Sequence, residues 1–118
     1  NYYFLNEFCK LLKIECRLSQ STEHYTLAQL DSFNPSERLV KLVQATNSQI
    51  YLTGPSAKNY IDLALFDQAG IEVLFADYEK LLTYPQGGSS FSKYVSIIDL
   101  IANVGFEAAP FYLCNNVV

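Results

Sequence analysis

A chain of 118 residues has room for one domain, near the lower size limit for a self-sufficient hydrophobic core. Apolar residues make up 50% of the chain and charged residues only 17%, which is more apolar surface than one small domain can bury, so we expect a partner surface. The formal net charge is -4 and the Lys and Arg residues are scattered singly, which argues against a nucleic acid or an anionic membrane as the partner.

No segment has the pattern of a membrane span or a signal peptide. Apolar runs stay well short of the roughly 18 to 20 residues that cross a bilayer, and no basic stretch followed by an apolar one opens the chain. Cys9, Cys16 and Cys114 are widely spaced among apolar residues, which is typical of reduced, buried thiols rather than of a disulfide framework. We therefore expect a cytoplasmic protein.

The first elements follow from apolar spacing. Apolar residues recur at helical spacing from Tyr3 to Leu12 with no start signal before them, so we expect the chain to begin partway into an element. Apolar and polar side chains then alternate over residues 14–19, which predicts a strand. A polar loop is expected over residues 20–26.

The motif Asn34-Pro35-Ser36-Glu37 predicts the start of a helix. Asn can cap the free N–H groups, Pro suits the first helical position, and Glu is placed to reach back to the cap. We expect this helix to end at Asn47 or Ser48 and a strand to follow over residues 50–53.

The next segment alternates helix and strand again. A helix is predicted from about Ser56 to Ala69, with Gly70 in the left-handed position that often follows a helix, and a strand begins at Ile71.

The last third of the chain opens with a long turn, predicted over residues 84–90. Ser96 is expected to cap a final helix over residues 97–104, which Gly105 ends. The pattern assigns no element to residues 106–118.

Helices that alternate with strands predict an α/β fold. We expect a single α/β domain over residues 1–118, built as a small three-layer sandwich with a mostly parallel sheet of about three strands and crossover helices. The edges of such a small sheet need more chain or a second copy, as in a homodimer, to cover them.

The carboxyl ends of parallel strands meet at one edge of the sheet, which predicts where a ligand binds. Thr53, Gly54 and Ser56 follow the central strand, and their amides and hydroxyls can hold a carboxylate, a phosphate or a sugar hydroxyl, with Lys58 as a supporting cation. The alternative is a tight turn and helix cap with no ligand. The segment lacks the second glycine and the Lys-Ser/Thr pair of a Walker loop.

Other polar residues are weighed for the same edge. Ser21 and His24 lie on the loop after the first predicted strand, and His24 is either a general base or a solvated loop histidine. Arg38 lies one turn into a capped helix, where it meets an anionic group or pairs with a surface charge. No Cys/His spacing or carboxylate pair predicts a metal site, and no cofactor is indicated.

Two further candidates lie in the last third of the chain. Gln86 follows Tyr84-Pro85 in a glycine-rich loop, where ligand contacts gather. Asp99 lies in an otherwise apolar helix, so its carboxylate either faces solvent or ties down a loop or a ligand; we favour a structural tie.

Five pieces of sequence, in this order, resemble the WbqC-like family of bacterial proteins over most of the chain. They are Glu37-Arg38-Leu39; Tyr51-Leu52-Thr53-Gly54-Pro55 with Lys58 and Tyr60; Ala69-Gly70-Ile71-Glu72-Val73; Tyr84-Pro85-Gln86 with Phe91; and Ser96-Ile97-Ile98-Asp99-Leu100 with Asn103 and Gly105. Members of that family are usually about twice this length, so the resemblance implies the carboxyl-terminal half of a longer protein.

The resemblance also implies a function. Family members are associated with surface-polysaccharide or O-antigen gene clusters, which implies a group transferase that moves an acyl or aminoacyl group onto a sugar. The substrate is then a small or sugar-linked molecule, contacted by Ser21, His24, Arg38, Thr53, Gly54, Ser56, Lys58, Tyr84, Gln86 and Asp99, with no catalytic residue assigned. The alternatives are a non-catalytic binding or dimerisation module and a small-molecule binding domain without turnover.

Overall fold

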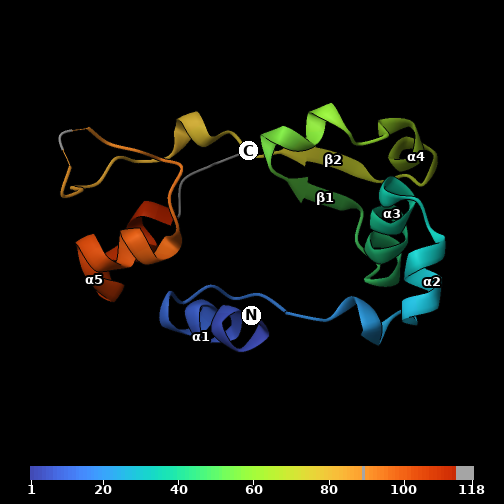
Figure 1. Cartoon of the computed structure of the whole chain (residues 1–118), viewed down its shortest axis with the longest axis horizontal. Coiled ribbons are helices and arrows are strands. Elements are labelled where there is room, and N and C mark those ends of the chain that lie inside the picture. Colours follow the sequence, from blue (N-terminus) through green and yellow to red (C-terminus); the bar gives the residue numbers. More distant parts are fainter. Residues whose placement is uncertain (89, 114–118) are drawn as a thin grey trace. The chain divides into compact units, whose positions relative to one another are not determined.

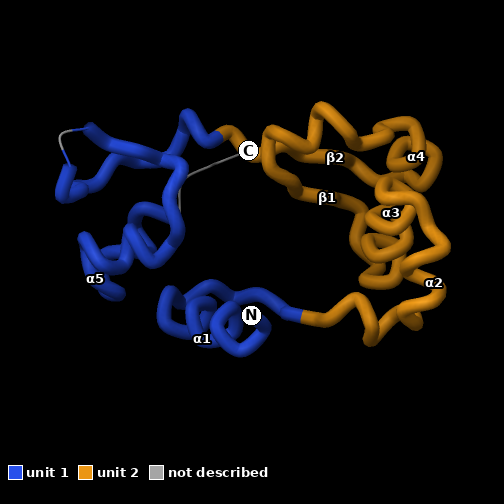
Figure 2. Tube along the Cα trace, viewed as in Figure 1, with its two compact units in different colours: residues 1–18, 78–117 blue, residues 19–77, 118 orange. Residues whose placement is uncertain are grey.

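The computed structural model describes residues 1–88 and 90–113. Within these residues the chain forms two compact units, which Figure 2 shows in different colours. Unit 1 comprises residues 1–18 and 78–113, and unit 2 comprises residues 19–77. The expectation of a single domain over residues 1–118 stays a prediction.

Unit 2 holds the parallel sheet. Strand β1 (Ile50–Thr53) pairs in parallel with strand β2 (Glu72–Phe75), so that Thr53 lies opposite Phe75 at the carboxyl end (Figure 1). The predicted α/β class is therefore compatible with the structure. The sheet described has two strands rather than the expected three.

The core of unit 2 lies on one face of this sheet. Helix α3 (Pro35–Ala45) contributes buried Val40 and Val43, and helix α4 (Leu63–Gln68) contributes Phe66. The ring of Phe66 stacks on the ring of Tyr51 with centroids 5.3 Å apart. Tyr51 and its partner Val73 face this core, whereas Ile50 and Leu52 are exposed, so a third layer is not confirmed among the residues described.

The remaining elements of unit 2 are short. The 3-10 helix η1 (Ser21–Glu23) and helix α2 (Leu27–Ser32) lie in the segment expected to be loop and connection. The side chain of Thr26 accepts from the amide of Gln29, and the Gln29 side chain accepts from the amide of Thr26. This reciprocal pairing is a capping box, which starts α2.

The prediction of a single helix from Ser56 to Ala69 is wrong. The segment forms the 3-10 helix η2 (Pro55–Asn59) and then α4, which starts separately. Asp62 caps α4, because its carboxylate accepts from the amide of Ala64 at 3.1 Å. The amide of Asp62 itself donates to the hydroxyl of buried Ser36 at 3.0 Å, so a contact with α3 replaces a hydrogen bond within a continuous helix.

Unit 1 contains helix α1 (Tyr2–Leu11), the 3-10 helix η3 (Tyr78–Lys80) and helix α5 (Ile97–Leu113). Its core gathers Leu12, just after α1, with Leu100 and Ala109 of α5. Ser96 starts α5 as predicted, its hydroxyl accepting from the amide of Ile98.

Gly105 ends the helical stretch predicted over residues 97–104, but a second helical stretch follows it within α5. The φ of 78° and ψ of 166° at Gly105 are non-helical, and the chain is helical again up to Leu113. Helical structure therefore covers the described part of the segment to which the sequence pattern assigned no element.

The prediction of a strand over residues 14–19 is wrong. These residues carry no strand and instead run back beside α1, where the hydroxyl of Tyr2 donates to the carbonyl of Leu18 at 3.3 Å. Ile14 is 44% exposed and Cys16 is exposed, so the alternating side chains do not form one buried face. The expectation of buried thiols is therefore wrong for Cys16; Cys9 is half-buried, and Cys114 lies outside the described residues.

Candidate functional site

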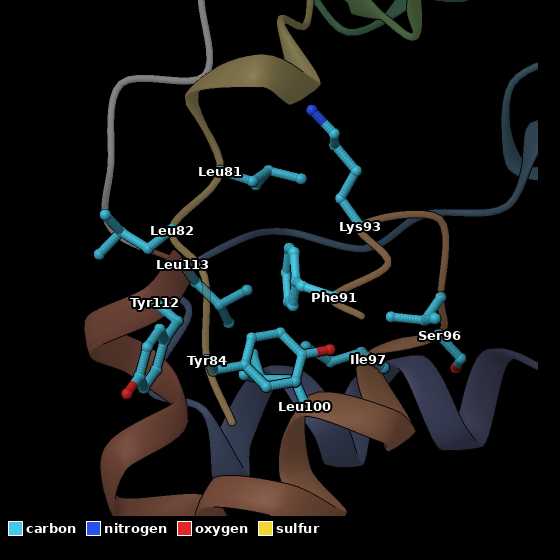
Figure 3. A pocket seen from close by; sticks show the side chains of 11 residues that line it. Leu81, Leu82, Tyr84, Phe91, Lys93, Ser96, Ile97, Leu100, Tyr112 and Leu113 are labelled. Carbon is cyan, nitrogen blue, oxygen red and sulfur yellow. The ribbon is translucent and has the colours of Figure 1, made fainter. Parts of the chain in front are cut away.

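An apolar pocket of about 210 Å³ opens in unit 1 between the segment after η3, the turn that follows it and α5. Figure 3 shows the ring of Phe91 beside the ring of Tyr84, with the Lys93 side chain extending away from both. Most of the side chains around the pocket are aliphatic or aromatic. The lining residues are Leu81, Leu82, Tyr84, Phe91, Lys93, Val95, Ser96, Ile97, Leu100, Tyr112 and Leu113.

Tyr84 fixes one wall of this pocket. Its ring packs edge-to-face on Phe91 and on Tyr112, with centroids 5.2 and 5.8 Å away. Its hydroxyl donates to the carboxylate of Asp99 at 2.7 Å. Burial raises the pKa of Tyr84 and the hydrogen bond to Asp99 raises it further, so the phenol stays protonated and remains a donor. The ring is thus held by aromatic packing on two sides and by a hydrogen bond at its tip.

Gln86 closes the turn that carries Phe91. Its side-chain amide bonds both backbone groups of Ser92: Nε2 donates to the carbonyl at 2.9 Å, and Oε1 accepts from the amide at 2.8 Å. Nε2 also lies 2.9 Å from Oδ2 of Asp99 and 3.0 Å from the hydroxyl of Tyr84. The polar groups of Gln86 are therefore engaged within unit 1, and the Asp99 carboxylate is the structural tie that the apolar helix pattern favoured.

Lys93 and Ser96 supply the polar side chains of the pocket lining. The Lys93 ammonium forms an ion pair with Glu79, whose side chain is 75% exposed. Ser96 uses its hydroxyl oxygen as the cap of α5. An apolar cavity beside a Lys–Glu ion pair suits the hydrocarbon part of a ligand whose other end is polar.

The residues predicted around the end of β1 lie in unit 2. Thr53 ends β1, and its carbonyl accepts from the amide of Ala76, just beyond β2, at 2.8 Å. The parallel register therefore puts the residues after both strands at one edge of the sheet, as expected. Gly54 caps η2, which contains Ser56 and Lys58, and the Lys58 ammonium lies 5.1 Å from the ring centroid of Phe75.

Ser21, His24 and Arg38 also belong to unit 2 but not to a strand end. Ser21 begins η1, His24 follows it, and Arg38 lies in the second turn of α3. Because residues 14–19 form no strand, the reason for placing Ser21 and His24 at the sheet edge is wrong. His24 Nε2 and Arg38 Nε are buried without a hydrogen-bond partner in the part of the chain that the structure describes.

The structure thus brings together three of the predicted site residues, Tyr84, Gln86 and Asp99. The other seven belong to unit 2, and their joint role in one crevice with these three stays a prediction. Sequence reasoning missed Lys93, Val95 and Tyr112, which complete the pocket. The turn before Ser96 was a usable signal, because its aromatic and cationic residues lead straight into a capped apolar helix.

Neither a metal centre nor a membrane-spanning helix is present among the described residues. No cluster of three or more His, Cys, Asp or Glu side chains is placed to hold a metal there. Nor does any helix of residues 1–88 and 90–113 have the length and apolar character needed to cross a membrane.

Comparison with known proteins identifies relatives of the chain. The model of the WbqC-like protein family matches residues 1–110. The uncharacterised protein Rv1507c of Mycobacterium tuberculosis is 41% identical over 113 residues. That match covers 96% of this chain but 46% of the relative, so the chain spans about half the length of the curated protein it matches. No solved structure matches the chain.

Proposed function

The chain belongs to the WbqC-like protein family, and from this premise we propose that it supplies the donor-binding part of a bacterial group transferase. In this proposal the enzyme moves an acyl or aminoacyl group onto a sugar destined for a surface polysaccharide. The pocket of unit 1 is the observation that carries the proposal, because it offers apolar walls to the group that is transferred.

The size and lining of the pocket favour the acyl group over the sugar. Its volume of about 210 Å³ is below the roughly 300 to 1,000 Å³ that holds a whole drug-sized ligand. A sugar needs several hydrogen-bonding groups around it, whereas Lys93 and Ser96 stand among aliphatic and aromatic side chains. A short acyl chain in the pocket matches this distribution, with the anionic remainder of its carrier taking the place of Glu79 beside Lys93.

Tyr84, Gln86 and Asp99 position this pocket rather than react in it. Their polar atoms bond to one another, and Gln86 also holds Ser92, which keeps Phe91 against Tyr84. A preformed wall reduces the entropy lost when a ligand binds.

Thermal-shift measurement with the intact chain tests the proposal. A ligand that binds the folded state stabilises it by about 2.7 kcal/mol at a hundredfold excess over Kd. Butyryl-coenzyme A, nucleotide-linked sugars and free amino acids are the probes. We expect the acyl thioester to raise the melting temperature and Val95→Trp, which adds a bulky side chain to the pocket lining, to abolish the rise.

The matched control is Tyr94→Trp. Tyr94 immediately precedes Val95, is 76% exposed and does not line the pocket, so this variant introduces the same indole and keeps the response. Equal stabilisation of the Val95→Trp variant, or no response to any acyl thioester, would overturn the donor-binding proposal.

A second candidate function, a non-catalytic association module, is favoured by the start of α1. Tyr3, Phe4 and Leu5 are 69%, 63% and 55% exposed, so three consecutive apolar side chains face solvent. If it pairs two copies of the chain, sedimentation velocity shows a dimer that Phe4→Asp dissociates. A monomer at all concentrations would argue against this function.

A further inference from the structure

The turn after α1 brings two cysteines together. The amide of Lys13 donates to the carbonyl of Lys10 at 3.1 Å, and the amide of Ile14 donates to the carbonyl of Cys9 at 2.8 Å. With Lys13 at a φ of 56°, this pair of bonds is a Schellman motif, which reverses the chain at the end of a helix. The returning segment then places the Sγ of Cys16 at 3.4 Å from the Sγ of Cys9.

Two contacts hold the returning segment in this register. The hydroxyl of Tyr2 donates to the carbonyl of Leu18, and the thiol of Cys16 donates to the sulfur of Cys9. The two thiols therefore lie close together for two reasons. The Schellman motif reverses the chain, and the hydrogen bond from Tyr2 to Leu18 holds the returning segment two residues beyond Cys16. A disulfide needs a sulfur separation of roughly 2.05 Å, so the sulfurs must approach by a little over 1 Å from the 3.4 Å of the structure.

The two thiols differ in access. Cys16 is exposed and Cys9 is half-buried. The hydrogen bond between the two thiols and desolvation raise the pKa of Cys9, because the protonated Cys9 thiol is the partner that can donate to a Cys16 thiolate, and this keeps Cys9 protonated. Exchange therefore begins at Cys16, the sulfur that a dissolved reagent reaches more easily.

We propose that Cys9 and Cys16 form a redox-modification site that accepts small-molecule disulfides such as oxidised glutathione. The thiolate of Cys16 attacks one sulfur of the disulfide, which releases one glutathione thiolate and leaves a mixed disulfide on Cys16. Cys9 loses its proton to solvent, its thiolate attacks the Cys16 sulfur, and the second glutathione thiolate leaves. The two cysteines are oxidised by two electrons, and one oxidised glutathione becomes two reduced molecules.

The product ties the segment after α1 to the helix. It closes the chain from residue 9 to residue 16 and fixes the turn that the Schellman motif already forms. This inference is independent of the donor-binding proposal, because neither cysteine lines the pocket of unit 1.

Mass spectrometry of the intact chain tests the site. In a Cys114→Ser background, the protein is equilibrated with oxidised and reduced glutathione, free thiols are alkylated, and peptides are mapped without reduction. We expect a Cys9–Cys16 disulfide in at least about tenfold excess over mixed disulfide, because a partner thiol on a short loop acts at millimolar effective concentration.

Single variants separate the steps. Cys9→Ser should accumulate the mixed disulfide on Cys16, and Cys16→Ser should slow modification several-fold, because the less accessible Cys9 must then react first. Stable mixed disulfides on both cysteines of the parent, or a parent that stays fully reduced while a free thiol peptide in the same buffer is oxidised, would overturn the proposal.

Discussion

Asp99 shows how one polar side chain can organise a mainly apolar pocket. Its Oδ2 accepts from the hydroxyl of Tyr84 and from the Nε2 of Gln86, and these two residues hold the wall and the turn. The sequence made a structural tie the favoured interpretation, because a carboxylate among apolar residues needs partners when it is not solvated. It could not identify the partners, which lie 13 and 15 residues away along an irregular segment.

A double-mutant cycle measures this tie. Asp99→Ala leaves the donors of Tyr84 and Gln86 without their acceptor, and we expect a loss of about 1 to 3 kcal/mol in the free energy of unfolding. Tyr84→Phe removes one donor, and the two changes should couple by about 0.5 kcal/mol or more in urea denaturation. Additive losses would mean that the hydrogen bond contributes nothing to stability.

The raised pKa of Tyr84 predicts that the stability of the protein falls at alkaline pH. Burial and the hydrogen bond to Asp99 raise its pKa in the folded state, so its contribution to stability is complete below the unfolded value of about 10 and is lost as the pH rises through the folded value. The free energy of unfolding of the parent should fall relative to Tyr84→Phe over that window. Parallel pH curves for the two proteins would contradict the assignment.

Helices α1, α3 and α4 end in the same way. After α1, α3 and α4 the chain turns through Lys13, Asn47 and Gly70, with φ values of 56°, 53° and 67°. Each end has the two backbone bonds of a Schellman motif. The turns after α3 and α4 lead to β1 and β2, and the turn after α1 leads to the segment that carries Cys16.

Substitution by glycine at these turns should raise the free energy of unfolding by an amount that depends on the residue replaced. A left-handed conformation costs a residue with a side chain about 1 to 2 kcal/mol, and Asn tolerates it better than Lys. Lys13→Gly should therefore raise the free energy of unfolding by about 0.5 to 1 kcal/mol, and Asn47→Gly by less. Chemical denaturation measures both, and the reverse order would contradict this account.

Elements with local signals were predictable from sequence, and those decided by distant contacts were not. The cap at Asn34, the strand over residues 50–53 and Gly70 all carry local signals, and the structure confirms them. The helix expected from Ser56 is not continuous, because the amide of Asp62 donates a hydrogen bond to the hydroxyl of Ser36 on α3. The capping box of Thr26 and Gln29 is a further local signal, and it marks the start of α2.

The predicted site residues lie in two different units of the chain. The sheet edge in unit 2 carries Thr53, Gly54, Ser56 and Lys58, and the pocket in unit 1 carries Tyr84. Parallel pairing of β1 and β2 was predictable from the alternation of helices and strands. The pocket was not, because its lining comes from an irregular segment and from a helical stretch beyond Gly105.

The most direct test of the donor-binding account is backbone-amide NMR of the intact chain during titration with butyryl-coenzyme A. The account predicts saturable chemical-shift changes at Phe91, Val95 and Leu100, which line the pocket. Changes confined to residues 53–58, or no change at all, would contradict it.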